Sequence, residues 1–163
     1  MVKYIVISIS IFLLSLLQTS FLSELFGAKY NPNLVLAFTL SLILLGSLEF
    51  GLYSGFAGGL LIDLMGVSIF GFSSLLNVLS VLCIFYIRKT FFKGNISFSI
   101  FAFIFSFLYL VLVNLTKLGN PYLYIFPSLS TSVFVWIFYL IVKNVYKGFL
   151  KNEYDQLSFK NRL

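Results

Sequence analysis

The segment from Gly51 to Gly71 reads Gly-Leu-Tyr-Ser-Gly-Phe-Ala-Gly-Gly-Leu-Leu-Ile-Asp-Leu-Met-Gly-Val-Ser-Ile-Phe-Gly, and its glycine spacing predicts how the chain packs. Gly51, Gly55 and Gly59 recur every four residues, so they share one face of a helix. In a lipid bilayer, small residues at this spacing let two helix backbones approach closely. We therefore expect a tightly packed helix face here, formed with another helix of this chain or with a second protein.

Two other features of the same segment refine this expectation. Gly58 and Gly71 adjoin the glycine face, and we include both in the predicted packing or partner interface. Asp63 is the acidic residue of the segment. A carboxylate at the centre of a membrane helix costs about 3 kcal/mol on insertion scales, so Asp63 needs a partner, an interfacial position or a function.

The composition places the chain in a membrane. Of its 163 residues, 60% are hydrophobic and only 10% are charged, which is too little polar surface for a soluble globule. The uninterrupted apolar runs lack the alternation of a membrane β-strand and instead have the length of membrane helices. We expect an all-α bundle of six transmembrane helices in a single domain, with spans at about 4–22, 33–48, 50–65, 69–87, 96–116 and 123–142.

The basic residues predict the orientation of these spans. With six spans and the amino terminus inside, most Lys and Arg residues fall on the cytoplasmic side, as short loops prefer, and only Lys29 and Lys117 fall outside. Fusing the second and third spans would separate the basic clusters onto opposite faces. The predicted basic cytoplasmic face comprises Arg88, Lys89, Lys93, Lys143, Lys147 and Lys151. Topology and anionic lipid headgroups explain this charge better than a nucleic-acid partner.

Local sequence signals support the span boundaries. Asn31-Pro32-Asn33 is expected to end the first external loop and begin the second span, because proline is tolerated in a first helical turn. Pro127 falls inside the predicted sixth span, where we expect a kink. The first span follows Lys3 like a secretory signal but lacks an alanine-type cleavage pattern, so we expect it to be retained.

The residue inventory argues against catalysis. The chain contains no histidine and a single cysteine, Cys83, which removes the commonest general base and any internal disulfide. Asp63 has no second membrane carboxylate to form an aspartyl-protease pair, and Ser54 has no histidine to activate it. We therefore expect no enzyme, cofactor or metal site. Asp63 has two structural interpretations: an interfacial, partly hydrated carboxylate near the outer end of the third span, or pairing with Lys29 or Lys117.

At this point the residues resemble a known family, the bacterial rod shape-determining protein MreD. The resemblance rests on Leu17-Gln18 late in the first span, on Asn31-Pro32-Asn33, and on the pattern Gly-Phe-x-x-Gly-x-x-x-Asp-Leu from Gly55 to Leu64 followed by Gly71. Length, six spans and a short basic tail agree over most of the chain. The second half contributes topology and little motif, and its richness in phenylalanine departs from the family.

The resemblance implies a non-enzymatic scaffold in the bacterial inner membrane. Proteins similar to this one bind the bitopic protein MreC, are linked to MreB filaments, and help to organise the glycosyltransferase RodA and a class B penicillin-binding transpeptidase during side-wall peptidoglycan synthesis. Whether the chain also forms a homodimer stays open. The family fold is similar to the substrate-binding S component of energy-coupling factor vitamin transporters.

That second likeness supplies the alternative function, a small-molecule uptake subunit. Such a subunit needs a cavity with converging polar groups, for which the candidates are Gln18, Asn77, Asn114 and Asp63 with nearby tyrosines. The scarcity of polar residues argues against this alternative.

Overall fold

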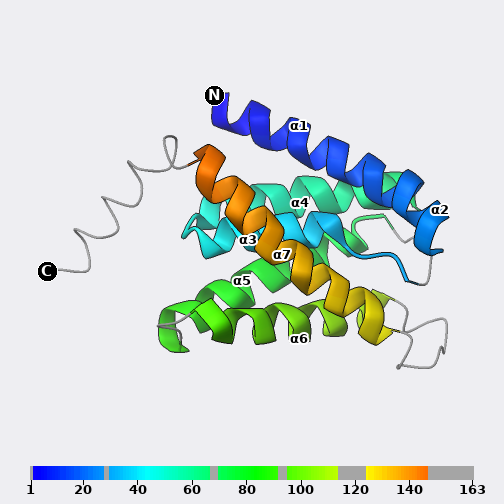
Figure 1. The fold of residues 1–163 in the computed structure, drawn as a ribbon. Coiled ribbons are helices and arrows are strands. Elements are labelled where there is room, and N and C mark those ends of the chain that lie inside the picture. Colours follow the sequence, from blue (N-terminus) through cyan, green and yellow to red (C-terminus); the bar gives the residue numbers. More distant parts are fainter. Residues whose placement is uncertain (1, 28–29, 67–69, 92–94, 114–123, 147–163) are drawn as a thin grey trace, which may run out of the picture.

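The computed structural model describes residues 2–27, 30–66, 70–91, 95–113 and 124–146, and these residues form helices without any strand. The first helical rod is continuous through α1, the π-helix η1 and α2, so the described residues form six rods, and the predicted all-α class is confirmed (Figure 1). The elements are α1 (Val2–Leu16), η1 (Leu17–Leu22), α2 (Ser23–Phe26), α3 (Leu34–Leu44), α4 (Leu48–Met65), α5 (Phe72–Phe91), α6 (Asn95–Val113) and α7 (Ile125–Tyr146).

Among the described residues, length and hydropathy together set three stretches apart from the other helices. Three stretches, Lys3–Phe26, Leu48–Met65 and Ile125–Val145, are long and apolar enough to cross a membrane. In contrast, α3 has 11 residues and rises about 16 Å, roughly half the thickness of a bilayer hydrocarbon core. The chain is thus suited to a membrane, but its second helix is too short to span one alone.

The short helix α3 lies at the centre of the bundle. Every residue from Leu34 to Ile43 is buried, and α3 packs against α7, α4, α1 and α5. One apolar core joins α3 to α5, α6 and α7, and a second joins it to α1, α4 and α7. Because α3 is enclosed by other helices, it carries apolar residues on all sides, and its two hydroxyls, on Thr39 and Ser41, donate to carbonyls of the helix itself.

The helix boundaries differ from the predicted spans at turns that glycine permits. α3 ends at Leu44, and Gly46 at φ 90° turns the chain into α4, which begins at Leu48. Gly71 has φ 86° just before α5, so the fourth helix begins at Phe72 rather than at 69. Only glycine adopts such a conformation at low cost. The last helix continues to Tyr146, four residues beyond the predicted end.

The kink predicted at Pro127 was wrong, because Pro127 is the third residue of α7. In this first turn the missing N–H has no helical partner to lose. The hydroxyls of Ser128 and Thr131 donate to carbonyls of the same turn, at 2.8 Å from Tyr124 O and 2.6 Å from Pro127 O. They therefore stabilise a helix start instead of repairing a break.

The bundle has two ends, and each is named here for the acidic residue that lies at it. At the first, which we call the Asp63 end, lie η1, α2, the starts of α3, α5 and α7, and the ends of α4 and α6 (Figure 1). At the opposite end, the Glu49 end, lie the start of α1, the α3–α4 turn and the end of α7. There, Tyr4 donates a hydrogen bond to Glu49, and the hydroxyls of Ser8 and Tyr53 are 2.7 Å apart.

Candidate functional site

The glycine face of α4 packs against α5 of the same chain. A Cβ atom built on Gly59 would lie 2.2 Å from Ser74 Cα and 2.5 Å from Ser74 N, so backbone touches backbone at this level. At Gly55 the same Cβ would lie 3.4 to 3.6 Å from Thr39, Val81 and Asn77, which is ordinary van der Waals contact. Two glycines four residues apart therefore differ: Gly59 lies where the helices are in very tight contact, and Gly55 lies where a methyl group would fit.

The neighbouring glycines face other helices. A Cβ on Gly58 would meet Val35 of α3 at 2.4 Å and Ile11 of α1 at 3.0 Å, whereas one on Gly51 would meet Ile43 of α3 at 2.9 Å. In both places the obstruction is a side chain, which can shift more readily than backbone. The sequence left open whether the glycine face packs against another helix of this chain or against a second protein. In the structure, the α4 glycines contact helices of this chain.

Asp63 lies at the end of α4 and caps the start of α5. Its side chain is only 4% exposed, and the backbone N–H of Ser73 donates to its carboxylate at 3.1 and 3.4 Å. The first N–H groups of a helix have no partner inside the helix, and the positive end of the helix dipole favours a carboxylate. Asp63 is therefore buried rather than hydrated as the sequence suggested. Lys29 and Lys117, its other predicted partners, lie outside the described residues.

The start of α3 is also capped inside the bundle. The side chain of Asn33 accepts a hydrogen bond from the N–H of Leu36 at 2.9 Å, and Gln18 on η1 accepts one from the N–H of Val35 at 3.2 Å. The backbone carbonyl of Gln18 accepts a third bond, from the side-chain amide of Asn31 at 2.7 Å. π-Helical turns frequently occur at functional positions, and here the turn carries Gln18 to the start of α3.

Two further side chains join these caps to α6 and α7. The backbone N–H of Asn33 donates to the Thr131 hydroxyl of α7 at 3.0 Å. The Tyr109 hydroxyl of α6 lies beside the side chains of Asn33 and Ser73 and near that of Asp63. One set of polar contacts, the Asp63-end network, thereby connects all six rods. Its members are Gln18, Asn31, Asn33, Asp63, Ser73, Tyr109 and Thr131.

The network satisfies polar groups that lipid could not satisfy. Lipid offers no hydrogen bonds, so non-helical backbone at membrane depth is tolerated only where protein satisfies it. Asn31, Pro32 and Asn33 are non-helical, and Pro32 and Asn33 are buried. Thr131 accepts from the backbone N–H of Asn33, and the Gln18 backbone carbonyl holds the Asn31 side chain. Among the described residues, no group of three or more His, Cys, Asp and Glu side chains is placed to hold a metal ion.

The predicted basic face is described only in part. Lys143 is exposed near the end of α7, with its ammonium 5.6 Å from the centre of the Tyr139 ring. Arg88 and Lys89 belong to α5. Lys93, Lys147 and Lys151 lie outside the described residues, as does Asn114 of the proposed uptake cavity.

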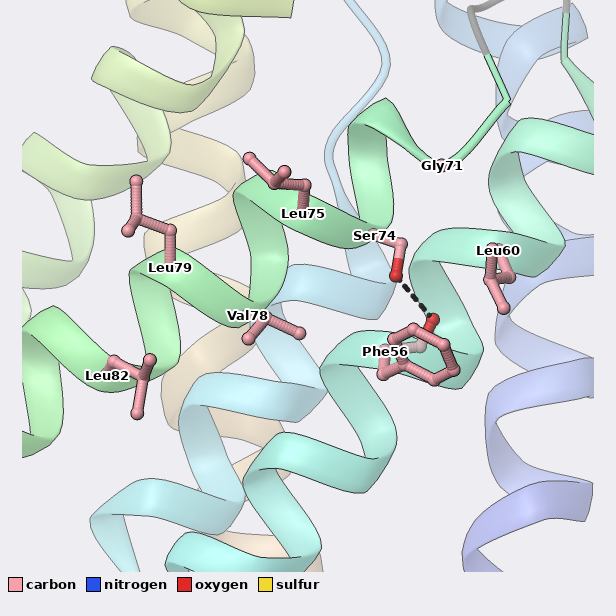
Figure 2. A pocket seen from close by; sticks show the side chains of 8 residues that line it. All are labelled: Phe56, Leu60, Gly71, Ser74, Leu75, Val78, Leu79 and Leu82. Carbon is pink, nitrogen blue, oxygen red and sulfur yellow. Dashed lines mark hydrogen bonds between the residues drawn. The ribbon is translucent and has the colours of Figure 1, made fainter.

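An apolar groove of about 540 Å³ runs along the outer surface between α4 and α5 (Figure 2). Phe56 and Leu60 line it from α4, and Leu75 and Leu79 line it from α5. The Ser74 hydroxyl, which borders the groove, donates to the Phe56 carbonyl at 3.1 Å. The groove therefore presents hydrocarbon side chains, which suits a lipid chain or an apolar helix rather than a polar metabolite.

Sequence reasoning missed several members of the network. The Asn-Pro-Asn pattern predicted the start of α3, and the membrane position of Asp63 predicted a need for a partner. Ser73, Tyr109 and Thr131 carried no such signal, because serine, tyrosine and threonine occur throughout the apolar runs of this chain. Their role depends on which helices are neighbours.

Comparison with known proteins adds no family. No protein-family model, curated protein or solved structure matched the chain.

Proposed function

We propose that this chain is a non-enzymatic scaffold of the bacterial inner membrane, resembling MreD, which binds MreC and helps to organise side-wall peptidoglycan synthesis. In this proposal both termini are cytoplasmic and the Asp63 end faces outward. MreB filaments, RodA and a class B penicillin-binding transpeptidase belong to the same assembly. The mechanism is assembly, without a covalent step.

One observation carries the proposal: the polar motif residues behind the resemblance hold helix starts at the same end of the bundle. Gln18 binds Asn31 and the first turn of α3, and Asn33 caps α3 and binds α7. Asp63, which ends the glycine motif, caps α5. Motifs from three separate parts of the sequence thus serve a single purpose, which is to fix helix ends against one another.

The nature of those contacts favours a scaffold. The hydrogen bonds of Gln18, Asn33 and Asp63 hold helix starts in place, and the Gly59 contact leaves no room for sliding. A rigid bundle of this kind presents a fixed outer surface on which a partner can assemble, because little ordering is required on binding.

The direct test is purification of the intact membrane complex from the native host. We expect a tagged wild-type chain, extracted in mild detergent, to retain a bitopic protein of the MreC type, identified by mass spectrometry. Depletion of the chain should turn rod-shaped cells round. Recovery of an ATPase and its membrane subunit in place of MreC, with unchanged cell shape, would refute the scaffold.

Two α4 variants sharpen this test. Gly59→Ala should disrupt the α4–α5 contact and reduce MreC recovery, whereas Gly55→Ala is the matched control, with room for its methyl group. Full MreC recovery with a demonstrably misfolded Gly59→Ala chain would show that the bundle itself is not the binding surface.

The uptake alternative keeps one supporting observation. Asn77 is fully buried in the core without a hydrogen-bond partner, as a ligand-binding amide would be. Gln18 and Asp63, the other candidates for that cavity, instead bind helix starts. Radiolabelled metabolite binding to the purified chain would favour uptake.

A further inference from the structure

Two buried polar side chains on adjacent helices have unused hydrogen-bonding capacity. Asn77 on α5 and Ser106 on α6 are both 0% exposed, and neither the Asn77 amide nor the Ser106 hydroxyl has a partner in the structure. Buried polar groups in folded proteins are nearly always hydrogen-bonded, to protein or to ordered water. Each of these two therefore calls for an explanation.

Ser106 differs from the buried hydroxyls that bond within their own helix, and it shares this property with Ser15 and Ser47. Buried serine and threonine side chains in membrane helices commonly donate to a carbonyl one turn earlier. Thr39 donates in this way to Val35 O, and Ser80 to Leu76 O, both at 2.8 Å. Ser106 makes no such bond, so its hydroxyl is available for a contact outside its own helix.

Helix register places Asn77 and Ser106 at the same depth. Ser73 of α5 interacts with Tyr109 of α6, and the two helices are neighbours that run in opposite directions (Figure 1). Asn77 follows Ser73 by four residues and Ser106 precedes Tyr109 by three, so each lies one turn further into the bundle on the same helix face. All four side chains are buried.

The local surroundings favour a small neutral ligand. Gly55 borders Asn77 from α4, and a Cβ there would lie 3.4 Å from Val81 and 3.6 Å from the backbone carbonyl carbon of Asn77, so the glycine leaves room for a methyl group at this level. Val81 and Leu76 supply apolar neighbours within the same buried cluster of α5. A water molecule can both donate and accept, so it can pair with an amide and with a hydroxyl, and buried waters typically make about three hydrogen bonds.

We propose that Asn77 and Ser106 bind one buried water molecule, which bridges α5 and α6 about one helical turn below the Asp63-end network. The Asn77 amide offers a donor and an acceptor, and the Ser106 hydroxyl offers either. The site extends the polar contacts between these helices toward the middle of the bundle. It is independent of the proposed scaffold function.

Water contact with the Asn77 side chain can be measured directly. The full-length chain is reconstituted in lipid with ¹⁵N-asparagine, and magnetisation transfer from water to side-chain NH₂ groups is recorded by solid-state NMR. The Asn77 signal is assigned by its loss in Asn77→Leu, or in Asn77→Asp where the leucine variant does not reconstitute. We expect transfer to the Asn77 NH₂ that survives a water-soluble paramagnetic quencher.

Two serine variants test the bridge. Ser106→Ala should weaken the Asn77 transfer by about twofold or more, because the water loses one of its few partners. Ser80→Ala is the matched control: it removes a buried hydroxyl of α5 that is already bonded within its helix, and it should leave the signal unchanged.

Each of the other outcomes overturns the site. Absence of transfer in the wild type means that no water contacts Asn77. Transfer that the quencher removes means bulk solvent in an open cavity, which would favour the uptake alternative. Transfer that Ser106→Ala and Ser80→Ala affect equally removes Ser106 from the site.

Discussion

Helix α4 meets α5 at two levels that look equivalent in sequence and differ in structure. At Gly59 the two backbones touch, and just beyond it Asp63 caps α5. At Gly55, one turn away, a methyl group would fit and the facing Asn77 has no hydrogen-bond partner. Glycine spacing therefore identifies a packing face, but only the crossing of the two helices determines which glycine is indispensable.

The largest effect is expected for Gly59→Ala. The added methyl group would overlap backbone atoms of Ser74, which cannot rotate away as a side chain can. We expect the free energy of unfolding to fall by about 3 kcal/mol or more, which is at the upper end for overpacking. The measurement is thermal unfolding in detergent with size-exclusion detection. A melting temperature equal to that of the wild type would show that the helices separate easily and that the seam is not tight.

Removal of the Asp63 cap should have the next largest effect. Asp63→Leu leaves the Ser73 N–H buried without an acceptor, which we expect to cost about 2 kcal/mol. Asp63→Asn is the matched control, since its carbonyl still accepts this bond and loses only the charge interaction with the helix dipole, about 0.5 kcal/mol. Equal melting temperatures for the two variants would contradict a capping role.

A smaller loss is expected at the start of α3. Asn33→Ala removes the acceptor for the Leu36 N–H, and loss of such a cap typically costs about 1 kcal/mol. Asn33→Asp should retain most of the stability in denaturant titration, because it keeps the accepting oxygen. The backbone bond from Asn33 to Thr131 survives both changes, so a full collapse of Asn33→Ala would reveal a larger role for the side chain.

Gly55→Ala should have the smallest effect and is the sharpest complement to Gly59→Ala. The space beside Gly55 accepts a methyl group, and alanine is favoured over glycine within a helix by up to about 1 kcal/mol. We expect an unchanged or slightly higher melting temperature. A loss as large as that of Gly59→Ala would mean that both levels are equally tight.

The sequence predicted the class of fold and the approximate position of each helix, because apolar length and turn residues are local signals. It also placed the start of α3 at Asn33, where proline and asparagine together indicate a helix cap. The prediction of a kink at Pro127 was wrong for a local reason. The apolar run begins before the helix does, so the proline falls in the first turn.

The candidate site was harder to predict from the sequence than the fold. Asp63 and Gln18 stood out as polar residues in apolar runs, but neither Ser73 nor Val35 could be identified as their partners. These bonds join residues 10 and 17 positions apart across helix turns, and that of Asn33 with Thr131 spans 98 positions. Such pairs depend on the order in which helices surround α3, which no local pattern encodes.

The burial of α3 has a consequence for biosynthesis. This helix is enclosed in part by α7, which the ribosome produces roughly 90 residues later. Until then one flank of α3 must rest against lipid or an insertion factor, and the backbone N–H of Asn33 lacks the Thr131 hydroxyl that accepts from it. Completion of the last helix, through Thr131, therefore closes the bundle around a segment that was among the first to be translated.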